Sequence, residues 1–127
     1  MNSERPKIKN FTDLIVWQEA HKLAILIYKI SENFPKHELF GLVSQLRRAI
    51  VSVTSNIAEG FSRISIKEKL QFYNISHGSL TEVENQLLLA KDLKYLSEQE
   101  FTEAYNQLLS VHKLLNLFIK STRLFNS

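Results

Sequence analysis

The sequence predicts an all-α protein, an antiparallel up-down-up-down four-helix bundle. Apolar residues recur at spacings of three and four along four long segments, which is the period of one face of an α-helix. Only three Gly and two Pro interrupt the 127 residues, so the chain has room for few, long elements. No segment shows the strict alternation or the Asn-Gly turn that would indicate β-strands. Four helices joined by short connections favour antiparallel neighbours.

Capping and breaking residues set the predicted helix boundaries. Pro35 ends the first helix, because the residue before a proline avoids the helical conformation. Ser65 with Glu68, and Ser97 with Glu100, are capping-box patterns that start the third and fourth helices. The resulting division is a flexible arm at 1–10, a bundle at 11–123 with helices at about 13–33, 38–61, 66–96 and 98–122, and a frayed C-terminus at 124–127.

The first predicted helix carries more apolar surface than one bundle can cover. It has two neighbouring apolar lines, and Ile15, Ile25 and Leu26 add to them. A helix in a four-helix bundle is never fully enclosed by its own chain. We therefore expect the outer face of this helix to meet another subunit.

The second predicted helix carries a line of small and polar side chains beside its apolar stripe. Small residues let another backbone approach closely, and polar groups that are shielded from water need partners. Antiparallel packing would place this line against the third helix. A glycine inside a helix costs about 1 kcal/mol relative to Ala, so we expect Gly78 of the third helix to be there because it allows close packing. The candidate network or interface consists of Gln45, Ser52, Asn56, Glu59, Ser79 and Glu82.

This polar group has two interpretations. One is a structural hydrogen-bond network in which an arginine pairs with Glu59 or Glu82, within or between subunits. The other is a ligand-binding or catalytic cleft in which these two acids act as an acid/base pair. The residues provide no complete set of nucleophile, base and orienting group, so the sequence favours the structural interpretation and a protein that is not an enzyme.

A second candidate site is basic. The chain has a formal charge of +3 and a pI near 9.2, and the excess charge belongs to limited regions. Further basic residues elsewhere in the chain could extend this basic site, namely Lys7, Lys9, Lys113, Lys120 and Arg123. A solvated surface is the alternative interpretation, since charge runs usually have that role. The candidate nucleic-acid-binding residues are Arg47, Arg48, Arg63, Lys67 and Lys69.

Several classes of site lack support in the sequence. The chain has no Cys, and its histidines at 21, 37, 77 and 112 include no pair spaced four apart on a helix, so we expect no metal site. No phosphate loop or dinucleotide motif is present, and we expect no cofactor. The N-terminus lacks an apolar core, and the apolar run at 23–30 is too short for a bilayer. A cytoplasmic protein is the expectation.

The combined motifs resemble a known family. They comprise Phe11-x-x-Leu14-x-Val16-Trp17-Gln18, Phe34-Pro35, Gly41-Leu42-x-x-Gln45-Leu46-Arg47-Arg48-Ala49 with Ser52 and Asn56-Ile57-Ala58-Glu59-Gly60, and Gly78-Ser79-x-x-Glu82. This pattern resembles the four-helix-bundle proteins encoded in intervening sequences of bacterial 23S ribosomal RNA genes. The resemblance implies a ring-shaped homo-oligomer, a pentamer in the family, and a connection with nucleic acid, but no settled activity. Related accessory variability proteins of diversity-generating retroelements work with a reverse transcriptase and RNA.

The residues and the resemblance together predict a non-enzymatic oligomeric binding or scaffold protein. Its expected partners are further copies of itself and structured RNA or other nucleic acid, without a membrane or a metal. Repetition around a ring would multiply weak phosphate contacts through avidity. The alternative is a protein-binding adaptor whose ring docks a polymerase or reverse transcriptase and has no direct nucleic-acid role.

Overall fold

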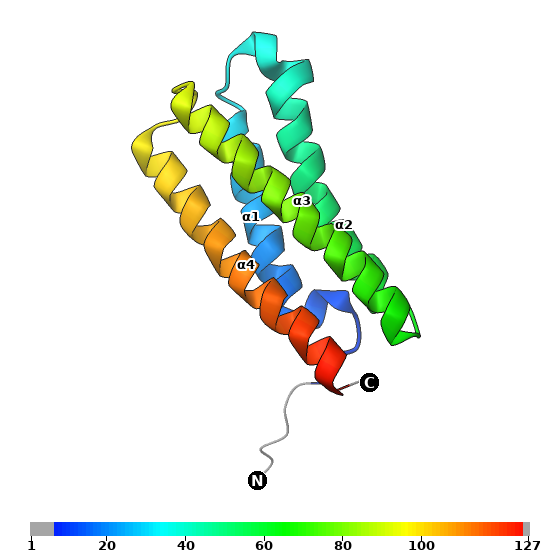
Figure 1. Cartoon of the computed structure of the whole chain (residues 1–127). Helices are drawn as coiled ribbons and strands as arrows, with labels where there is room; N and C mark the ends of the chain where they lie inside the picture. The colour runs from blue at the N-terminus through cyan, green and yellow to red at the C-terminus, as the bar shows by residue number, and fades with distance from the viewer. Residues whose placement is uncertain (1–6, 126–127) are drawn as a thin grey trace.

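The computed structural model describes residues 7–125 and consists, over that range, of helices and short connections. The long helices are α1 (Ile15–Ser31), α2 (Ser44–Phe61), α3 (Ile66–Asp92) and α4 (Glu98–Phe125), and the short helical segments are η1 (Phe11–Asp13), η2 (Lys36–Glu38) and η3 (Leu39–Val43). Successive long helices run in opposite directions (Figure 1). The predicted all-α four-helix fold is therefore confirmed. Most of the predicted arm, residues 1–6, and the end of the predicted frayed terminus lie outside the described residues.

The core lies along the axis of the bundle. Each long helix packs against two others, in the cyclic order α1, α2, α3, α4. The apolar stripes predicted from the sequence supply this core, and Leu23, Leu46, Leu87 and Leu115, one from each helix, are fully buried. Burial of such side chains stabilises the fold by about 1.5–3 kcal/mol each. Within residues 7–125, no helix combines the length and the apolar content needed to cross a membrane.

Helix α2 begins later in the chain than the sequence predicts. The expected start is at 38, but the backbone of Gly41 is non-helical, with φ −109° and ψ −109°. The chain therefore passes through the wide turn η3 before α2 begins at Ser44. The carboxylate of Glu38 accepts a hydrogen bond from the Leu42 N–H at 3.2 Å and so satisfies a backbone donor in this turn.

The ends of α3 and α4 also differ from the predicted boundaries. Helix α3 ends at Asp92 instead of 96, because Lys94 adopts a left-handed conformation with φ 62° and the Tyr95 N–H donates to the Ala90 carbonyl at 2.9 Å. The predicted capping box at α4 is confirmed: Ser97 Oγ accepts from the Glu100 N–H at 3.0 Å, and Glu100 accepts from the Ser97 N–H at 2.8 Å. Helix α4 continues to Phe125.

The predicted close packing at Gly78 is wrong. A Cβ atom added there would meet nothing within 4 Å, and the residue is exposed. The close contact between α2 and α3 lies instead at Gly60, where an added Cβ would be 2.6 Å from Tyr73 Cε1. The sequence shows both glycines, but only the crossing of the two helices determines which one faces a neighbour.

Candidate functional site

A hollow between α2 and α3, which we call the polar groove, contains most of the predicted polar network. Its volume is about 460 Å³. Residues from one side of α2, from the turn before it and from α3 line the groove. The lining residues are Phe40, Ser44, Gln45, Arg48, Ala49, Ser52, Ser79, Glu82 and Gln86.

Hydrogen bonds join the two helices beside the groove. Ser52 Oγ and Ser79 Oγ are 2.8 Å apart, and Asn56 Nδ2 donates to the Ser52 carbonyl and hydroxyl at 2.8 and 3.0 Å. The buried hydroxyl of Ser76 donates to the Val53 carbonyl at 2.8 Å. The structure thus brings together three members of the predicted network, and their hydrogen bonds satisfy one another within the chain.

Other polar groups of the groove have no partner among residues 7–125. Arg48 and Glu82 are exposed and take part in no ion pair or hydrogen bond there, and the same holds for Gln45. Gln86 is only 8% exposed, and its Oε1 atom is buried without a hydrogen bond. An unsatisfied buried carbonyl costs about 1–3 kcal/mol. The groove therefore combines a free cation, a free anion and an amide whose oxygen accepts no hydrogen bond.

Glu59 does not join the polar groove. Its carboxylate pairs with the Arg63 guanidinium at 2.9 Å, between the last turn of α2 and the connection that follows it, on a partly exposed surface. The arginine partner that the sequence predicted for Glu59 is therefore present within the chain. Glu59 does not line the groove that contains Glu82, so the structure does not bring these two acids into one pocket.

Three of the five predicted nucleic-acid-binding residues make contacts within the chain. Arg47 Nε donates to Ser31 Oγ at 2.9 Å, and the Arg47 guanidinium also donates to the Tyr28 carbonyl at 3.1 Å and stacks over the Tyr28 ring. Arg63 pairs with Glu59 and stacks over the Phe72 ring. These contacts join α2 to its neighbours, so the two arginines have a structural use.

Lys69 is the third engaged cation. Its ammonium donates to the Phe61 carbonyl at 2.9 Å and so caps the C-terminus of α2, where positive charge is favoured. Partial burial lowers the pKa of Lys69. Of the five predicted residues, only Arg48 and Lys67 have no ion pair, hydrogen bond or ring contact within the described range. The structure does not unite the five in one open patch.

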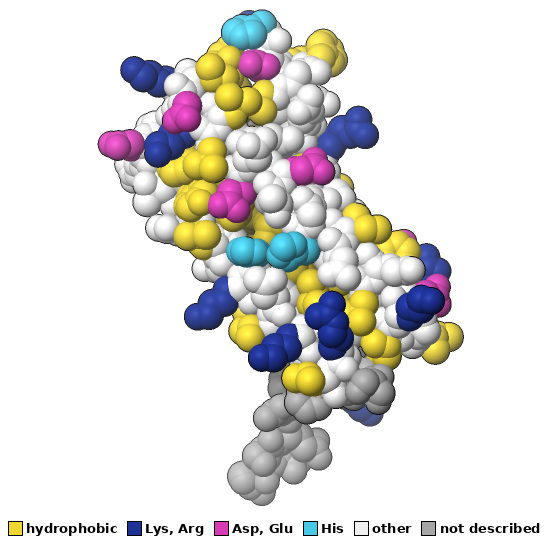
Figure 2. Space-filling view, viewed as in Figure 1, with side chains coloured by type: hydrophobic (Ala, Val, Ile, Leu, Met, Phe, Trp, Pro, Cys, Tyr) yellow, Lys and Arg dark blue, Asp and Glu magenta, His cyan; other side chains and the backbone are white. Residues whose placement is uncertain are grey.

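Other free cations lie in the half of the bundle where α2 ends, α3 begins and α4 ends, from the middle of α4 to its C-terminus (Figure 1). We call Lys67, Lys113, Lys120 and Arg123 the basic end; all four side chains are exposed and none is paired within residues 7–125. Lys and Arg predominate in the lower half of the face shown in Figure 2, whereas most acidic side chains there lie in the upper half. The charge separation is therefore a property of the folded molecule.

Sequence reasoning missed an apolar surface on the other side of α2. Phe40, in the turn before α2, is 92% exposed, and Tyr28, Leu39 and Val51 are exposed beside it around a hollow of about 700 Å³. We call these four residues the Phe40 patch. The hollow shares Phe40 and Arg48 with the polar groove, so the two surfaces are continuous. The signal in the sequence was weak, because a single Phe beside a glycine does not reveal that it points outward.

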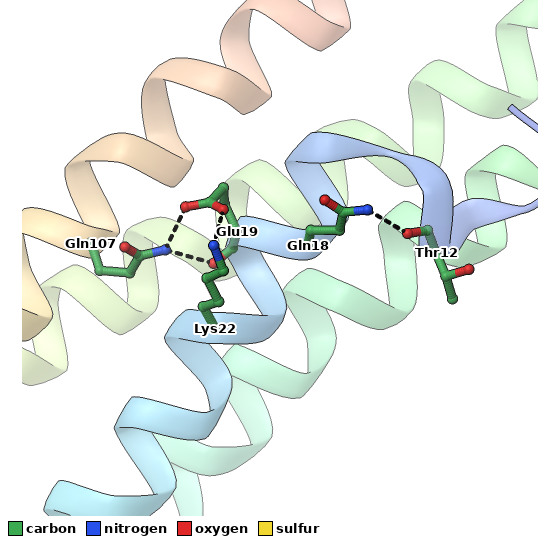
Figure 3. A network of polar contacts seen from close by, with 5 residues as sticks. All are labelled: Thr12, Gln18, Glu19, Lys22 and Gln107. Carbon is green, nitrogen blue, oxygen red and sulfur yellow. Dashed lines mark hydrogen bonds and ion pairs between the residues drawn. The ribbon is translucent and has the colours of Figure 1, made fainter. Parts of the chain in front are cut away.

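Polar contacts between α1 and α4 differ from those of the groove because they are satisfied (Figure 3). Gln107 Nε2 donates to the Glu19 carbonyl at 2.9 Å and to the Glu19 carboxylate at 3.3 Å, and Lys22 pairs with the same carboxylate at 2.7 Å. The bonds from Lys22 and then Gln107 lower the pKa of Glu19. Glu19, Lys22 and Gln107 thus bind one another, unlike Arg48, Glu82 and Gln86 of the polar groove, which have no ion pair or hydrogen bond within residues 7–125.

The fold and these surfaces define a small helical-bundle protein with exposed apolar side chains and with polar groups unpaired within residues 7–125 on adjoining sides of α2. Residues 12–117 match the family model described as 23S rRNA-intervening sequence protein, and the chain belongs to that family. Its fold is similar to the crystal structure of a protein of unknown function from the S23 ribosomal protein family of Bacteroides thetaiotaomicron, with a TM-score of 0.78 and 23% identity over 85% of this chain and 97% of that chain. A search of curated proteins found no match.

Proposed function

We propose that this protein is a non-enzymatic scaffold that assembles into homo-oligomers and, in that form, binds structured RNA or other nucleic acid. The observation that carries the proposal is the continuous surface formed by the Phe40 patch and the polar groove. It combines a phenylalanine that is 92% exposed with Arg48, Glu82 and Gln86, none of which forms an ion pair or hydrogen bond within residues 7–125. Large exposed apolar side chains rimmed by polar groups are typical of protein interfaces.

Self-association would bury the Phe40 patch and would give partners to the unpaired side chains of the polar groove. The Phe40 patch would be removed from water, which stabilises by about 25 cal/mol per Å² of apolar area. Arg48 of one copy could then pair with an acidic side chain of the next, and Glu82 with a basic one, the arrangement between subunits that the sequence left open. A ring needs head-to-tail contacts, so this surface would meet a different patch on the next copy. We include a pentamer in the proposal because of the resemblance to the family.

The nucleic-acid part of the proposal depends on the basic end. Lys67, Lys113, Lys120 and Arg123 are free within the described residues, unlike Arg47, Arg63 and Lys69. An oligomer would repeat this weak positive surface once per copy and add the phosphate contacts through avidity. Recognition should be mostly independent of sequence, because lysine contacts with phosphates carry no base information.

The absence of an enzymatic role is part of the same proposal. Glu59 binds Arg63, whereas Glu82 lines the polar groove, so the two acids do not form an acid/base pair around one pocket. We also place the protein in the cytoplasm, because a chain without cysteine gives no support for an oxidising compartment.

Self-association is tested by light scattering coupled to size-exclusion chromatography. We expect the wild-type protein to be an oligomer at micromolar concentration and Phe40→Ser to shift it toward monomer. Ile64→Ser is the matched control, because Ile64 is 96% exposed but lies in the connection between α2 and α3, outside the Phe40 patch. A monomeric wild-type protein, or equal effects of the two substitutions, would remove this part of the proposal.

Nucleic-acid binding is tested with a charge-reversed variant of the basic end, Lys67→Glu with Lys113→Glu and Lys120→Glu. We expect it to bind a structured RNA more weakly and with a shallower salt dependence. Each phosphate that is no longer neutralised reduces the slope of the logarithm of the binding constant against the logarithm of the salt concentration by about one. The control is Lys29→Glu with Lys36→Glu and Lys94→Glu, which changes the charge equally outside the basic end. Equal RNA affinity of the two folded variants would contradict the proposed surface.

The second candidate is a protein-binding adaptor, for which the apolar character of the Phe40 patch is the specific support. A polyanion would not favour that patch, whereas a protein partner such as a polymerase or reverse transcriptase could cover it. Affinity capture from lysate with and without nuclease treatment distinguishes the two. A partner protein that survives nuclease treatment but no longer binds the Phe40→Ser variant would favour the adaptor.

A further inference from the structure

His77 of α3 and His112 of α4 lie in contact at the interface between these helices. Their Nε2 atoms are 3.2 Å apart, their ring centroids are 5.1 Å apart, and both residues are half-buried. Figure 2 shows two adjacent histidine side chains on this face of the molecule. The contact has no counterpart in the sequence, where the two residues are 35 positions apart.

Contacts on both sides hold the two imidazoles in register. Toward one end of the bundle, the Tyr105 hydroxyl donates to the Glu84 carboxylate at 2.6 Å. Toward the other end, the rings of Tyr73 and Phe118 pack with their centroids 4.7 Å apart. Each contact joins α3 to α4, so the helices cannot slide past one another without breaking it. The histidines are therefore held together by the fold.

We propose that His77 and His112 form a binding site for a divalent transition-metal ion, with Zn²⁺ as the first candidate. Two imidazole nitrogens bound at 2.0–2.1 Å to a tetrahedral zinc ion are about 3.3–3.4 Å apart. The observed 3.2 Å is close to that separation. Water would occupy the remaining positions, as it occupies the fourth position of zinc sites with three protein ligands.

The ring positions support a shared ion more than a straight hydrogen bond. A tetrahedral ion between the two Nε2 atoms would place the ring centroids about 5.2 Å apart, whereas a straight N–H···N bond in line with both rings would place them about 5.5 Å apart. The observed centroid separation is 5.1 Å. At least one ring is therefore tilted away from the line that joins the two nitrogens, as a shared ion requires.

Binding requires a change of tautomer and no other chemistry. Without metal, one neutral ring donates its Nε2–H to the Nε2 atom of the other. With metal, both Nε2 atoms supply a lone pair, so the donor ring carries its proton on Nδ1 and no net proton is released. Imidazole is a preferred ligand for Zn²⁺, Cu²⁺ and Ni²⁺. Residues 7–125 contain no group of three or more His, Cys, Asp and Glu suited to a metal, so the site has two protein ligands.

The competing interpretation is a hydrogen bond between two neutral histidines that only joins α3 to α4. The two interpretations differ in what zinc does to the folded protein. An ion that binds the native state and bridges two helices raises the melting temperature by mass action, whereas a simple hydrogen bond gives no response to zinc.

The test uses the full chain without an affinity tag, freed of metal and titrated with ZnCl₂ by calorimetry. We expect one ion per chain for the wild-type protein, and affinity at least about tenfold weaker for His77→Gln and for His112→Gln. His21→Gln and His37→Gln are the matched controls, because each removes one histidine from another element, and both should bind as the wild type does. Circular dichroism of each metal-free variant checks that it is folded.

A second measurement needs no substitution. In the ¹H–¹⁵N spectrum of the wild-type imidazoles, zinc should shift the resonances of two histidines together and raise the melting temperature, while the other two remain unchanged. No heat of binding and no shift at millimolar zinc would overturn the proposal. Equally weakened affinity in the control variants would overturn it as well, because the ion would then be bound elsewhere.

Discussion

Gly60 lies at a close contact between α2 and α3. A Cβ atom there would be 2.6 Å from Tyr73 Cε1 and 3.0 Å from Phe72 Cβ. Tyr73 is almost fully buried and packs against Phe118, so its ring cannot move aside freely. The same burial raises the pKa of the Tyr73 hydroxyl to about 12. One hydrogen atom in place of a side chain therefore permits the helix pair that contains the polar groove.

Substitution of Gly60 by alanine should destabilise the protein by about 1–3 kcal/mol, the usual cost of overpacking a core. Gly78→Ala is the matched control, because it adds the same methyl group to an exposed position with nothing within 4 Å. We expect that control to be neutral or to stabilise by up to about 1 kcal/mol, since alanine favours the helix. Urea unfolding of both variants measures the difference, and equal free energies of unfolding would contradict the assignment of the close contact.

At the scale of elements, Glu38 connects the start of α2 with the turn between α3 and α4. One carboxylate oxygen accepts from the Leu42 N–H at 3.2 Å, and the other accepts from the Tyr95 hydroxyl at 2.8 Å. These bonds, the Leu42 N–H first, hold the pKa of Glu38 below its ordinary value of 4.5. The same bond to Glu38 raises the pKa of the Tyr95 hydroxyl. The ionised carboxylate is thus the form that stabilises this corner.

The sign of the pH dependence follows from the lowered pKa of Glu38. Its contribution to the free energy of unfolding is fully present above the unfolded value near 4.5 and is lost as the pH falls through the lower folded value. Glu38→Gln should therefore lower stability at pH 7 and make the loss of stability toward pH 3 smaller than in the wild type. The variant will still lose some stability toward pH 3, because Asp13 and Glu19 also have lowered pKa values.

Urea unfolding of the Glu38→Gln variant at pH 7 and pH 3 measures both effects. Glu103→Gln is the control, because Glu103 is an exposed acid on α4 without a hydrogen bond or ion pair in the described part of the chain. It should leave the pH dependence of the wild type unchanged. If the free energy of unfolding of Glu38→Gln changes with pH as it does in this control, the Glu38 carboxylate does not stabilise the contact between the start of α2 and the turn between α3 and α4.

At the scale of the whole molecule, one chain leaves the Phe40 patch in water. Under the proposed self-association, unfolding is coupled to dissociation, so the melting temperature should rise with protein concentration. Calorimetry over a wide range of protein concentration should show this rise for the wild type and for Ile64→Ser. Phe40→Ser should show a smaller rise or none. A melting temperature independent of concentration in the wild type would indicate that the folded state does not depend on other copies.

The elements of the fold were predictable because their signals are local. The apolar periodicity and the capping pairs Ser65/Glu68 and Ser97/Glu100 act within a few residues, so the sequence shows them directly. Helix ends governed by a special backbone conformation were less accessible. Lysine at position 94 gives no sign of the left-handed conformation that ends α3, because glycine is the usual residue there.

The candidate site was predictable only in part. The lines of small residues correctly indicated that Ser52, Asn56 and Ser79 come together, since helical spacing places them on facing sides. The sequence did not reveal which of the five basic residues remain free, because that depends on the partners that packing brings to each cation. Arg47 meets Ser31 and the Tyr28 carbonyl from a different helix, and no local pattern reveals that contact.

The sequence by itself determined four helices, the N-terminal caps of α3 and α4 and the apolar stripes of the core, because each depends on residues within one or two turns. Only the tertiary structure decided that Gly60 and not Gly78 faces a neighbour, that Phe40 points into solvent, and that His77 meets His112. The physical reason is that these properties depend on the angle and register at which two helix faces meet, and side chains far apart in the chain set both.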